Sequence, residues 1–219
     1  MLSETFIATS LGTCLGIFYL VNLYNLVRNR KRRKPSSLEI KPEIEQPEPP
    51  RTFFTILGVF GTLVFWFESI IYVILVFTDV LHSLDNFLFP LKFPFAFCVQ
   101  ILGIFLTASG YFLFTWSVIT RGRYATAWEM PENHKLVTSG PYNYVRHPSY
   151  LSYFMMFFGL FFIWLTWIAL IPIVAIPGYL QIVDAEERML IQRFGDEYLA
   201  YQERVGRFFP NTKLQRIKP

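Results

Sequence analysis

Two short polar segments stand among long apolar runs in the C-terminal half of this chain. The first contains His134-Lys-Leu-Val137, Gly140-Pro-Tyr142 and Arg146-His-Pro-Ser-Tyr150, and the second is the pair Glu186-Glu187. Carboxylates, histidines, an arginine and tyrosines are polar groups that can converge on a ligand pocket. No CxxC, HExxH, GxGxxG or P-loop pattern occurs, and Cys14 and Cys98 both lie in apolar runs. The sequence therefore predicts no metal site.

The apolar stretch between these segments, Tyr150 to Val183, is long enough to fold back on itself. Its 34 residues would extend about 51 Å as a helix, which is too long for one ordinary crossing of a ~30 Å hydrocarbon core. We predict a short-legged hairpin that turns near Trp164 to Trp167, with Pro172 and Pro177 kinking the return leg. Such a hairpin would bring the two polar segments together at the membrane surface.

Three further apolar runs precede the hairpin: Phe6 to Val27, Phe53 to Thr78, and Phe95 to Ile119. The first lacks the basic leading region of a signal peptide, so it reads as a retained span. The second is interrupted only by Glu68, an intramembrane acid that either serves a function or bonds to Ser69 or Ser117. The sequence predicts an all-α, polytopic membrane helix bundle with about five transmembrane helices.

The distribution of positive charge predicts the orientation of the bundle. Only 16% of the residues are charged, and the chain contains 20 Lys and Arg. An N-terminus outside and a C-terminus in the cytoplasm place residues 28–51, 121–149 and 184–219 in the cytoplasm, with nineteen of these twenty cations. This is the positive-inside pattern, and it excludes nucleic acid as the explanation of the net charge of +4.

The remaining segments complete the predicted organisation. Residues 35–50, with five prolines and four glutamates, are typical of a solvated loop. Residues 184–205 have the apolar spacing of a cytoplasmic amphipathic helix with a break at Gly195. We divide the chain into an N-terminal helix with a basic, proline-rich loop (1–52), two transmembrane helices (53–120) and a C-terminal core with the hairpin (121–219).

This core resembles a known family. The stretches HKLVTSGPYNYVRHPSY and EERMLIQRFGDEYLAYQERVGRFFP are similar to the isoprenylcysteine carboxyl methyltransferases and to the wider group of phospholipid and small-lipid methyltransferases. The likeness covers roughly residues 121–210. The five-span plan resembles the small prokaryotic members, which favours a cell membrane over the endoplasmic reticulum.

The resemblance implies S-adenosylmethionine as cofactor and assigns residues to it. The implied cofactor-binding residues are His134, Lys135, Leu136, Val137, Tyr142, His147, Pro148, Ser149, Tyr150 and Glu187. The implied catalytic residues are Glu187 and Arg146, although Arg146 equally fits a positive-inside anchor. Neighbouring side chains on a helix point about 100° apart, so only one of the two glutamates can face the pocket, and the resemblance to the family implies that it is Glu187.

One position departs from the family pattern. Members usually have an arginine five or so residues before the second glutamate, where it is thought to hold the substrate carboxylate, but here the equivalent residue is Ile182. A carboxylate acceptor would need another cation, either Arg146 or Arg188.

The sequence favours methyl transfer to a lipid-like acceptor, with a prenylcysteine-type carboxylate first. Three alternatives stay open: methylation of a phospholipid or other lipid amine, an NADPH-dependent membrane reductase, and a non-catalytic lipid-binding homologue. The predicted partners are a prenylated or lipid-like substrate and membrane lipids.

Overall fold

The computed structural model describes residues 2–32, 52–88, 90–122 and 135–211. These residues form helices and short 3-10 segments, and only isolated bridges of β type occur among them. In chain order the elements are α1 (Glu4–Arg32), α2 (Thr52–Phe77), η1 (Leu81–Leu84), α3 (Asp85–Leu88), α4 (Ala96–Arg121), η3 (Gly140–Asn143), α5 (Pro148–Trp164), η4 (Ile168–Val174), α6 (Ala175–Phe194) and α7 (Asp196–Arg204). The predicted all-α class is confirmed.

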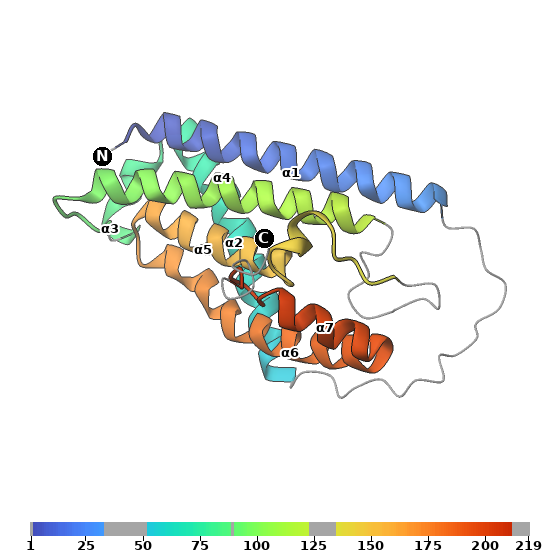
Figure 1. Ribbon diagram of the computed structural model, residues 1–219. Helices are drawn as coiled ribbons and strands as arrows, with labels where there is room; N and C mark the ends of the chain where they lie inside the picture. Colours follow the sequence, from blue (N-terminus) through green and yellow to red (C-terminus); the bar gives the residue numbers. More distant parts are fainter. Residues whose placement is uncertain (1, 33–51, 89, 123–134, 212–219) are drawn as a thin grey trace, which may run out of the picture.

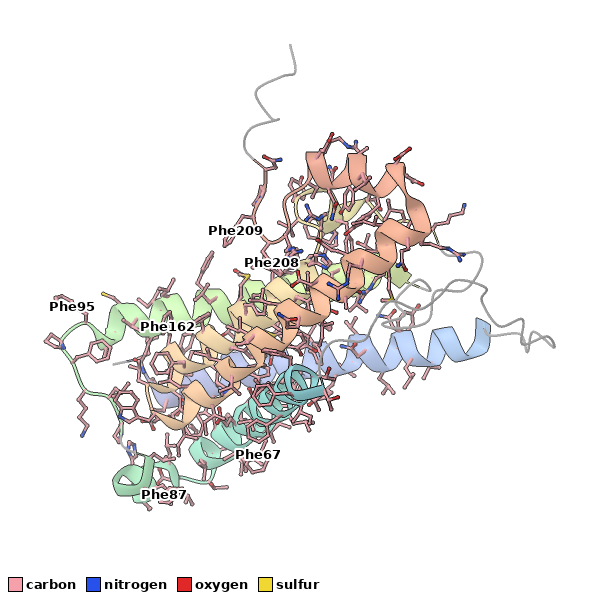
Figure 2. All side chains as sticks on the ribbon, turned by 90° about the horizontal axis from the view of Figure 1, so that it is seen from below. Phe67, Phe87, Phe95, Phe162, Phe208 and Phe209 are labelled. Atoms are coloured by element: carbon pink, nitrogen blue, oxygen red, sulfur yellow. The ribbon has the colours of Figure 1, made fainter. Side chains whose placement is uncertain are left out.

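Four segments are long and apolar enough to cross a membrane: Glu4–Val27, Thr52–Phe77, Ala96–Arg121 and Ile168–Phe194. α5 is also apolar but has only 17 residues. Large apolar side chains such as Phe67, Phe87 and Phe95 point outward from the bundle (Figure 2), where lipid would cover them. The chain is therefore an integral membrane protein. In the last span the apolar stretch ends at Val183, and the charged residues that follow lie beyond it.

The two ends of the bundle are built from different parts of the chain (Figure 1). At one end, the Leu2 N–H donates to the Gln100 side chain at 2.8 Å, and the Leu91 N–H donates to the Leu165 carbonyl at 2.7 Å. The start of the chain, the α3–α4 connection and the turn after α5 thus meet there. The opposite end gathers the C-terminal end of α4, the segment that contains η3, and α7.

Small residues let α4 and α5 pack closely against each other. A Cβ atom at Gly159 would lie 2.3 Å from the Thr107 hydroxyl oxygen, and one at Gly110 would lie 2.7 Å from a side-chain carbon of Met156. Close approach through small residues is a common way for helices to associate in a membrane. This contact fixes the end of α4 beside the start of α5.

The chain reverses direction directly after α5. Leu165 has a left-handed backbone (φ 51°), and its N–H caps the helix by donating to Phe161. The return leg begins as η4, a 3-10 segment with Pro172 inside it, and continues as α6. A 3-10 turn accommodates this proline because proline cannot donate the backbone hydrogen bond of an α-helix. The return leg then leads the glutamate pair back to the start of α5.

α6 and α7 are separated at Gly195, where φ is 51°. Tyr198, Tyr201 and Val205 form a small apolar cluster with their neighbours Leu136, Leu190, Ile191 and Phe194. The apolar face of the 184–205 segment therefore packs onto the loop before η3. This packing closes the polar end of the bundle.

Candidate functional site

A cavity opens at the polar end of the bundle, where four separate segments meet. The space in it and in front of it, counted out to open solvent, is about 640 Å³. The cavity is lined by Arg121, Leu136, Val137, Tyr142, Arg146, His147, Pro148, Ser149, Tyr150, Glu186, Leu190, Tyr198 and Tyr201. The lining comes from the end of α4, residues 136–150, α6 and α7.

The structure brings together most of the residues that the sequence predicts to bind cofactor. Leu136, Val137 and Tyr142 line the cavity, as do all four residues from His147 to Tyr150. Lys135 is exposed and is not part of the lining. His134 lies outside the described residues. Glu187 is buried, but it is not part of the lining either.

Backbone and hydroxyl contacts hold the segment from Gly140 to Ser149 against α4. Gly140 has a left-handed backbone (φ 60°), and a Cβ atom there would lie 2.7 Å from the Thr120 hydroxyl oxygen, so a side chain would clash. The hydroxyls of Ser117 and Ser149 hydrogen-bond at 2.8 Å. The C-terminal segment secures the other side, because the Arg146 and His147 N–H groups donate to the carbonyls of residues 206 and 207.

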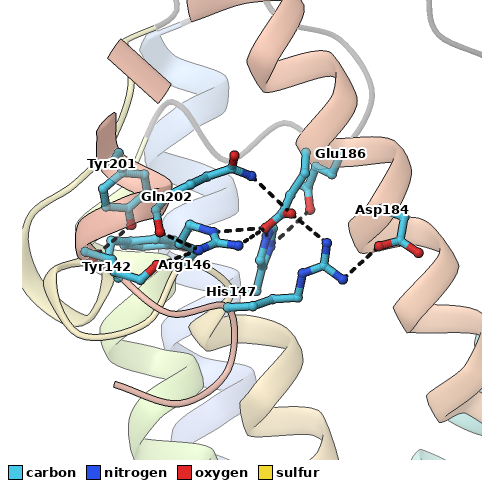
Figure 3. Close-up of polar contacts among 10 residues, drawn as sticks. Tyr142, Arg146, His147, Asp184, Glu186, Tyr201 and Gln202 are labelled. Atoms are coloured by element: carbon cyan, nitrogen blue, oxygen red, sulfur yellow. Dashed lines mark hydrogen bonds and ion pairs between the residues drawn. The ribbon is translucent and has the colours of Figure 1, made fainter. Parts of the chain in front are cut away.

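Glu187 lies at the centre of a buried polar cluster, as its hydrogen bonds show. Figure 3 draws the polar contacts around this cluster as dashed lines. Its Oε1 accepts from Arg146 Nε at 3.0 Å and Nη2 at 2.9 Å, and from His147 Nε2 at 3.0 Å. Its Oε2 accepts from Arg207 Nη2 at 2.6 Å and Gln202 Nε2 at 3.2 Å. This carboxylate therefore joins α6 to the start of α5, to α7 and to the C-terminal segment.

The surroundings of Glu187 keep it ionised. Burial disfavours a charged carboxylate, but hydrogen bonds from His147 and Arg207 and the ion pair with Arg146 favour it. The hydrogen bond to Glu187 in turn raises the pKa of Arg207, whose Nη1 also donates to Asp184 at 2.8 Å. A carboxylate with this many protein donors has little capacity left for a ligand.

The structure thus places the glutamate pair differently from our expectation. Glu186, not Glu187, lines the cavity. Its Oε2 atom is buried without a hydrogen-bond partner in the described part of the chain, 3.7 Å from His147 Nδ1. The two side chains point in different directions, as expected. However, Glu187 is the one that points toward the cations behind the cavity wall.

Arg146 lines the cavity, but its guanidinium is engaged by the protein. Besides Glu187, it donates from Nη1 to the carbonyls of Gln202 and Val205. Its side chain is 11% exposed. These bonds give Arg146 an architectural role that its position in the sequence does not reveal.

Besides Glu186, four lining residues were absent from the predicted site: Arg121, Leu190, Tyr198 and Tyr201. The three on α6 and α7 belong to the predicted amphipathic helix, whose apolar face was assigned only to packing. Tyr201 also donates from its hydroxyl to the Tyr142 carbonyl. Arg121 is the first charged residue after the third apolar run, a signal that was counted for topology alone.

Four of the ten buried side-chain polar atoms that lack a hydrogen-bond partner among the described residues belong to residues that line this cavity. Arg121 Nε, Tyr142 Oη, Glu186 Oε2 and Tyr198 Oη are all buried and make no hydrogen bond within the described residues. All four residues line the same cavity. Since buried polar groups are normally satisfied, their convergence indicates a polar ligand or ordered water.

Glu68 lies apart from this site, within α2. Its side chain is buried, and neither carboxylate oxygen has a partner among the described residues. Ser117 bonds to Ser149 and to the Phe114 carbonyl, so the bond between Glu68 and Ser117 that we considered is not formed.

The part of the chain that carries the cavity is similar to a known family. Residues 98–197 match the sequence model of the phospholipid methyltransferase family. This range contains most of α4, the segment from 135 to 150, the hairpin and the glutamate pair. The likeness is therefore to phospholipid methyltransferases, over the part of the chain that builds the cavity.

The chain is also similar to two curated proteins of one name. The chain is 27% identical over 126 residues to a protein-S-isoprenylcysteine O-methyltransferase of Xenopus laevis, covering 55% of this chain and 44% of the relative. It is 31% identical over 96 residues to the protein of the same name of Homo sapiens, covering 41% of this chain and 32% of the relative. The chain spans less than half the length of either relative. Its similarity is to the isoprenylcysteine carboxyl methyltransferase family.

A solved structure carries the same family name. It is that of a eukaryotic intramembrane Ras methyltransferase, isoprenylcysteine carboxyl methyltransferase, at 27% sequence identity and a TM-score of 0.39. The match covers 72% of this chain and 52% of the other.

Proposed function

We propose that this chain is an integral-membrane methyltransferase that uses S-adenosylmethionine to methylate a lipid-like acceptor, with a prenylcysteine-type carboxylate favoured. The observation that carries this proposal is the convergence of four unpartnered buried polar atoms on one cavity. That cavity is built from the segments that the family resemblance assigns to the cofactor. The two curated relatives are named protein-S-isoprenylcysteine O-methyltransferases, which supports the same acceptor.

The residues of the cavity fit this cofactor. S-adenosylmethionine has an amino acid head, an adenine and a sulfonium whose methyl group is the one transferred. Glu186 has the charge for an ammonium group, and the hydroxyls of Tyr142 and Tyr198 are available as donors or acceptors. Leu136, Val137 and Leu190 provide apolar surface for the adenine. Tyrosine rings also suit a cation such as the sulfonium.

The protein's own contribution to the reaction is alignment and exclusion of water. A carboxylate acceptor is already ionised at pH 7 and needs no general base. The cavity walls have to hold the acceptor oxygen in line with the methyl group, and a good alignment of this kind lowers the barrier substantially. The Glu187 cluster serves this task indirectly by holding the segment from Arg146 to His147 in place.

Transfer of a radiolabelled methyl group tests the proposal. The purified protein in detergent would be incubated with methyl-labelled S-adenosylmethionine and N-acetyl-S-farnesylcysteine, with the amide of that compound as control. We expect label on the acid and none on the amide. The product is a methyl ester, so mild base should release the label as volatile methanol.

A lipid amine is the second candidate acceptor, because the matching family model is that of phospholipid methyltransferases. Phosphatidylethanolamine would be offered in a parallel reaction. Label in that lipid that resists base would replace the carboxylate acceptor with an amine. Failure to label any acceptor, with no binding of the cofactor, would contradict methyl transfer, and consumption of NADPH would favour a reductase.

A further inference from the structure

Arg121 is a half-buried cation that lines the cavity. It is the last residue of α4, and its Nε atom is buried with no hydrogen bond within the described residues. No ion pair joins it to an acidic residue of the described ranges either. Arginine is always charged in proteins, and a buried N–H donor of a charged group is costly to leave unpaired. The buried side of this guanidinium therefore suits an anionic acceptor in the cavity.

The other arginines near the cavity do not meet this need. Arg146 is engaged by Glu187 and by two carbonyls, and Arg207 is engaged by Glu187 and Asp184. Arg188 is exposed on α6 and does not line the cavity. Of the two cations that the sequence suggested for a carboxylate, one is already bonded and the other lies outside the cavity.

A carboxylate of this protein does not neutralise Arg121 either. Glu186 lines the same cavity with a buried, unpartnered oxygen, yet the two form no ion pair. The charges of both act on the Tyr150 hydroxyl, which lines the same cavity. A cation and an anion that face one cavity without touching each other are arranged for a ligand that supplies the opposite charges.

We propose that Arg121 binds a carboxylate group of a ligand in this cavity. The planar guanidinium offers a fork of N–H donors that matches the two oxygens of a carboxylate. Two ligands of the proposed reaction carry a carboxylate: the cofactor, in its amino acid head, and the prenylcysteine acceptor. In naming these two ligands, the inference rests on the proposed function. With Ile182 at the position where the family resemblance leads one to expect an arginine, Arg121 would supply the missing cation from a different helix.

Comparing each ligand with a partner that lacks the carboxylate shows whether Arg121 binds the carboxylate of the cofactor or that of the acceptor. Calorimetry on the detergent-purified protein would compare S-adenosylmethionine with its decarboxylated form, and N-acetyl-S-farnesylcysteine with its amide. The wild type is expected to prefer at least one acid over its partner by about 10- to 150-fold, the range of a charge-assisted hydrogen bond. Arg121→Gln should remove that preference and leave the affinity for the partner without the carboxylate unchanged.

Two further variants control for folding and for general charge. Arg121→Lys keeps the charge but loses the fork, so it should restore part of the preference. Arg204→Gln removes an exposed arginine of α7 and should leave all four affinities as in the wild type. The melting temperature in detergent should be the same for every variant that is compared.

The outcomes distinguish the ligand and can overturn the inference. Loss of preference for the cofactor acid places the cofactor head on Arg121, and loss of preference for the farnesylcysteine acid places the acceptor there. A preference that survives in Arg121→Gln, or that Arg188→Gln removes instead, would overturn the inference while the methyltransferase stands. A wild type that binds none of the four compounds would overturn both.

Discussion

At the scale of the residue, the glutamate pair shows how adjacent side chains of one helix acquire different tasks. A rotation of about 100° per residue turns Glu187 toward Arg146, His147 and Arg207, and turns Glu186 toward the cavity. Glu187 neutralises cations that would otherwise be buried without a counter-charge. Glu186 keeps an oxygen free for a ligand.

We predict that Glu187→Gln destabilises the fold and that Glu186→Gln does not. Removing one partner of a buried ion pair typically costs about 3–5 kcal/mol, and Glu187 has two arginine partners. Thermal unfolding in detergent, followed by circular dichroism, measures this loss. A melting temperature of Glu187→Gln equal to that of the wild type would contradict the structural role of the cluster.

For Glu186→Gln we expect weaker binding of S-adenosylmethionine with an unchanged melting temperature. A lost charge-assisted hydrogen bond corresponds to about a 10- to 150-fold loss of affinity. Calorimetry gives this value directly. Unchanged affinity would remove Glu186 from the proposed cofactor site.

At the scale of the element, the site depends on contacts between helices whose residues never touch a ligand. α4 and α5 approach closely through glycines, which sets Arg121 beside the segment from His147 to Tyr150. The C-terminal segment then pairs with residues 146 and 147 through its backbone carbonyls. Both contacts position the cavity walls from outside.

Gly159→Ala should loosen the contact between α4 and α5. The added methyl group would lie 2.3 Å from the Thr107 hydroxyl oxygen and 2.8 Å from the Thr107 nitrogen, and the backbone atom cannot move aside. Overpacking of this kind costs about 1–3 kcal/mol. Gly16→Ala on α1 is the matched control, since nothing lies within 4 Å of its added carbon. Equal melting temperatures for both variants would contradict the tight packing.

Arg207→Ala should weaken cofactor binding although Arg207 does not line the cavity. It removes the bonds to Glu187 and Asp184 that tie the C-terminal segment to α6. Because Arg146 and His147 depend on the same cluster, their positions should become less fixed. Arg204→Ala, at an exposed site three residues earlier, is the comparison. Identical cofactor affinities in the two variants, measured by calorimetry, would rule out this coupling.

At the scale of the whole molecule, the two ends of the bundle are built from different segments. The start of α1, the connection before α4 and the turn after α5 lie at one end, and the C-terminal end of α4, η3 and α7 lie at the other (Figure 1). Residues of these last three elements line the cavity. The three segments that hold nineteen of the twenty Lys and Arg belong to the cavity end in the predicted topology. Such a bias would place the cavity on the cytoplasmic side.

Labelling of single cysteines in intact cells tests this orientation. In a background without Cys14 and Cys98, Ser3→Cys should react with an impermeant maleimide, whereas Ser139→Cys and Glu203→Cys should react only after the membrane is opened. External labelling of Glu203→Cys would contradict the hairpin, because an even number of spans would then export the C-terminal cations.

The sequence by itself determined the class of protein and most of the cavity. Apolar runs of membrane length and clustered cations are properties of composition and order along the chain, so they predicted an all-α membrane bundle and the positions of its helices. The motif from Leu136 to Tyr150 predicted most of the cavity lining, because its residues are neighbours in the sequence. The break at Gly195 follows from local backbone preference.

Only the tertiary structure decided which charges are free. Whether Glu186 or Glu187 faces the cavity depends on the rotation of α6 against α5, and that rotation is set by packing over many residues. Arg146 and Arg121 carry the same charge in the sequence, but the fold surrounds the first with acceptors and leaves the second facing the cavity. The energy of a charge depends on its partners in space, and those partners come here from four helices and the C-terminal segment.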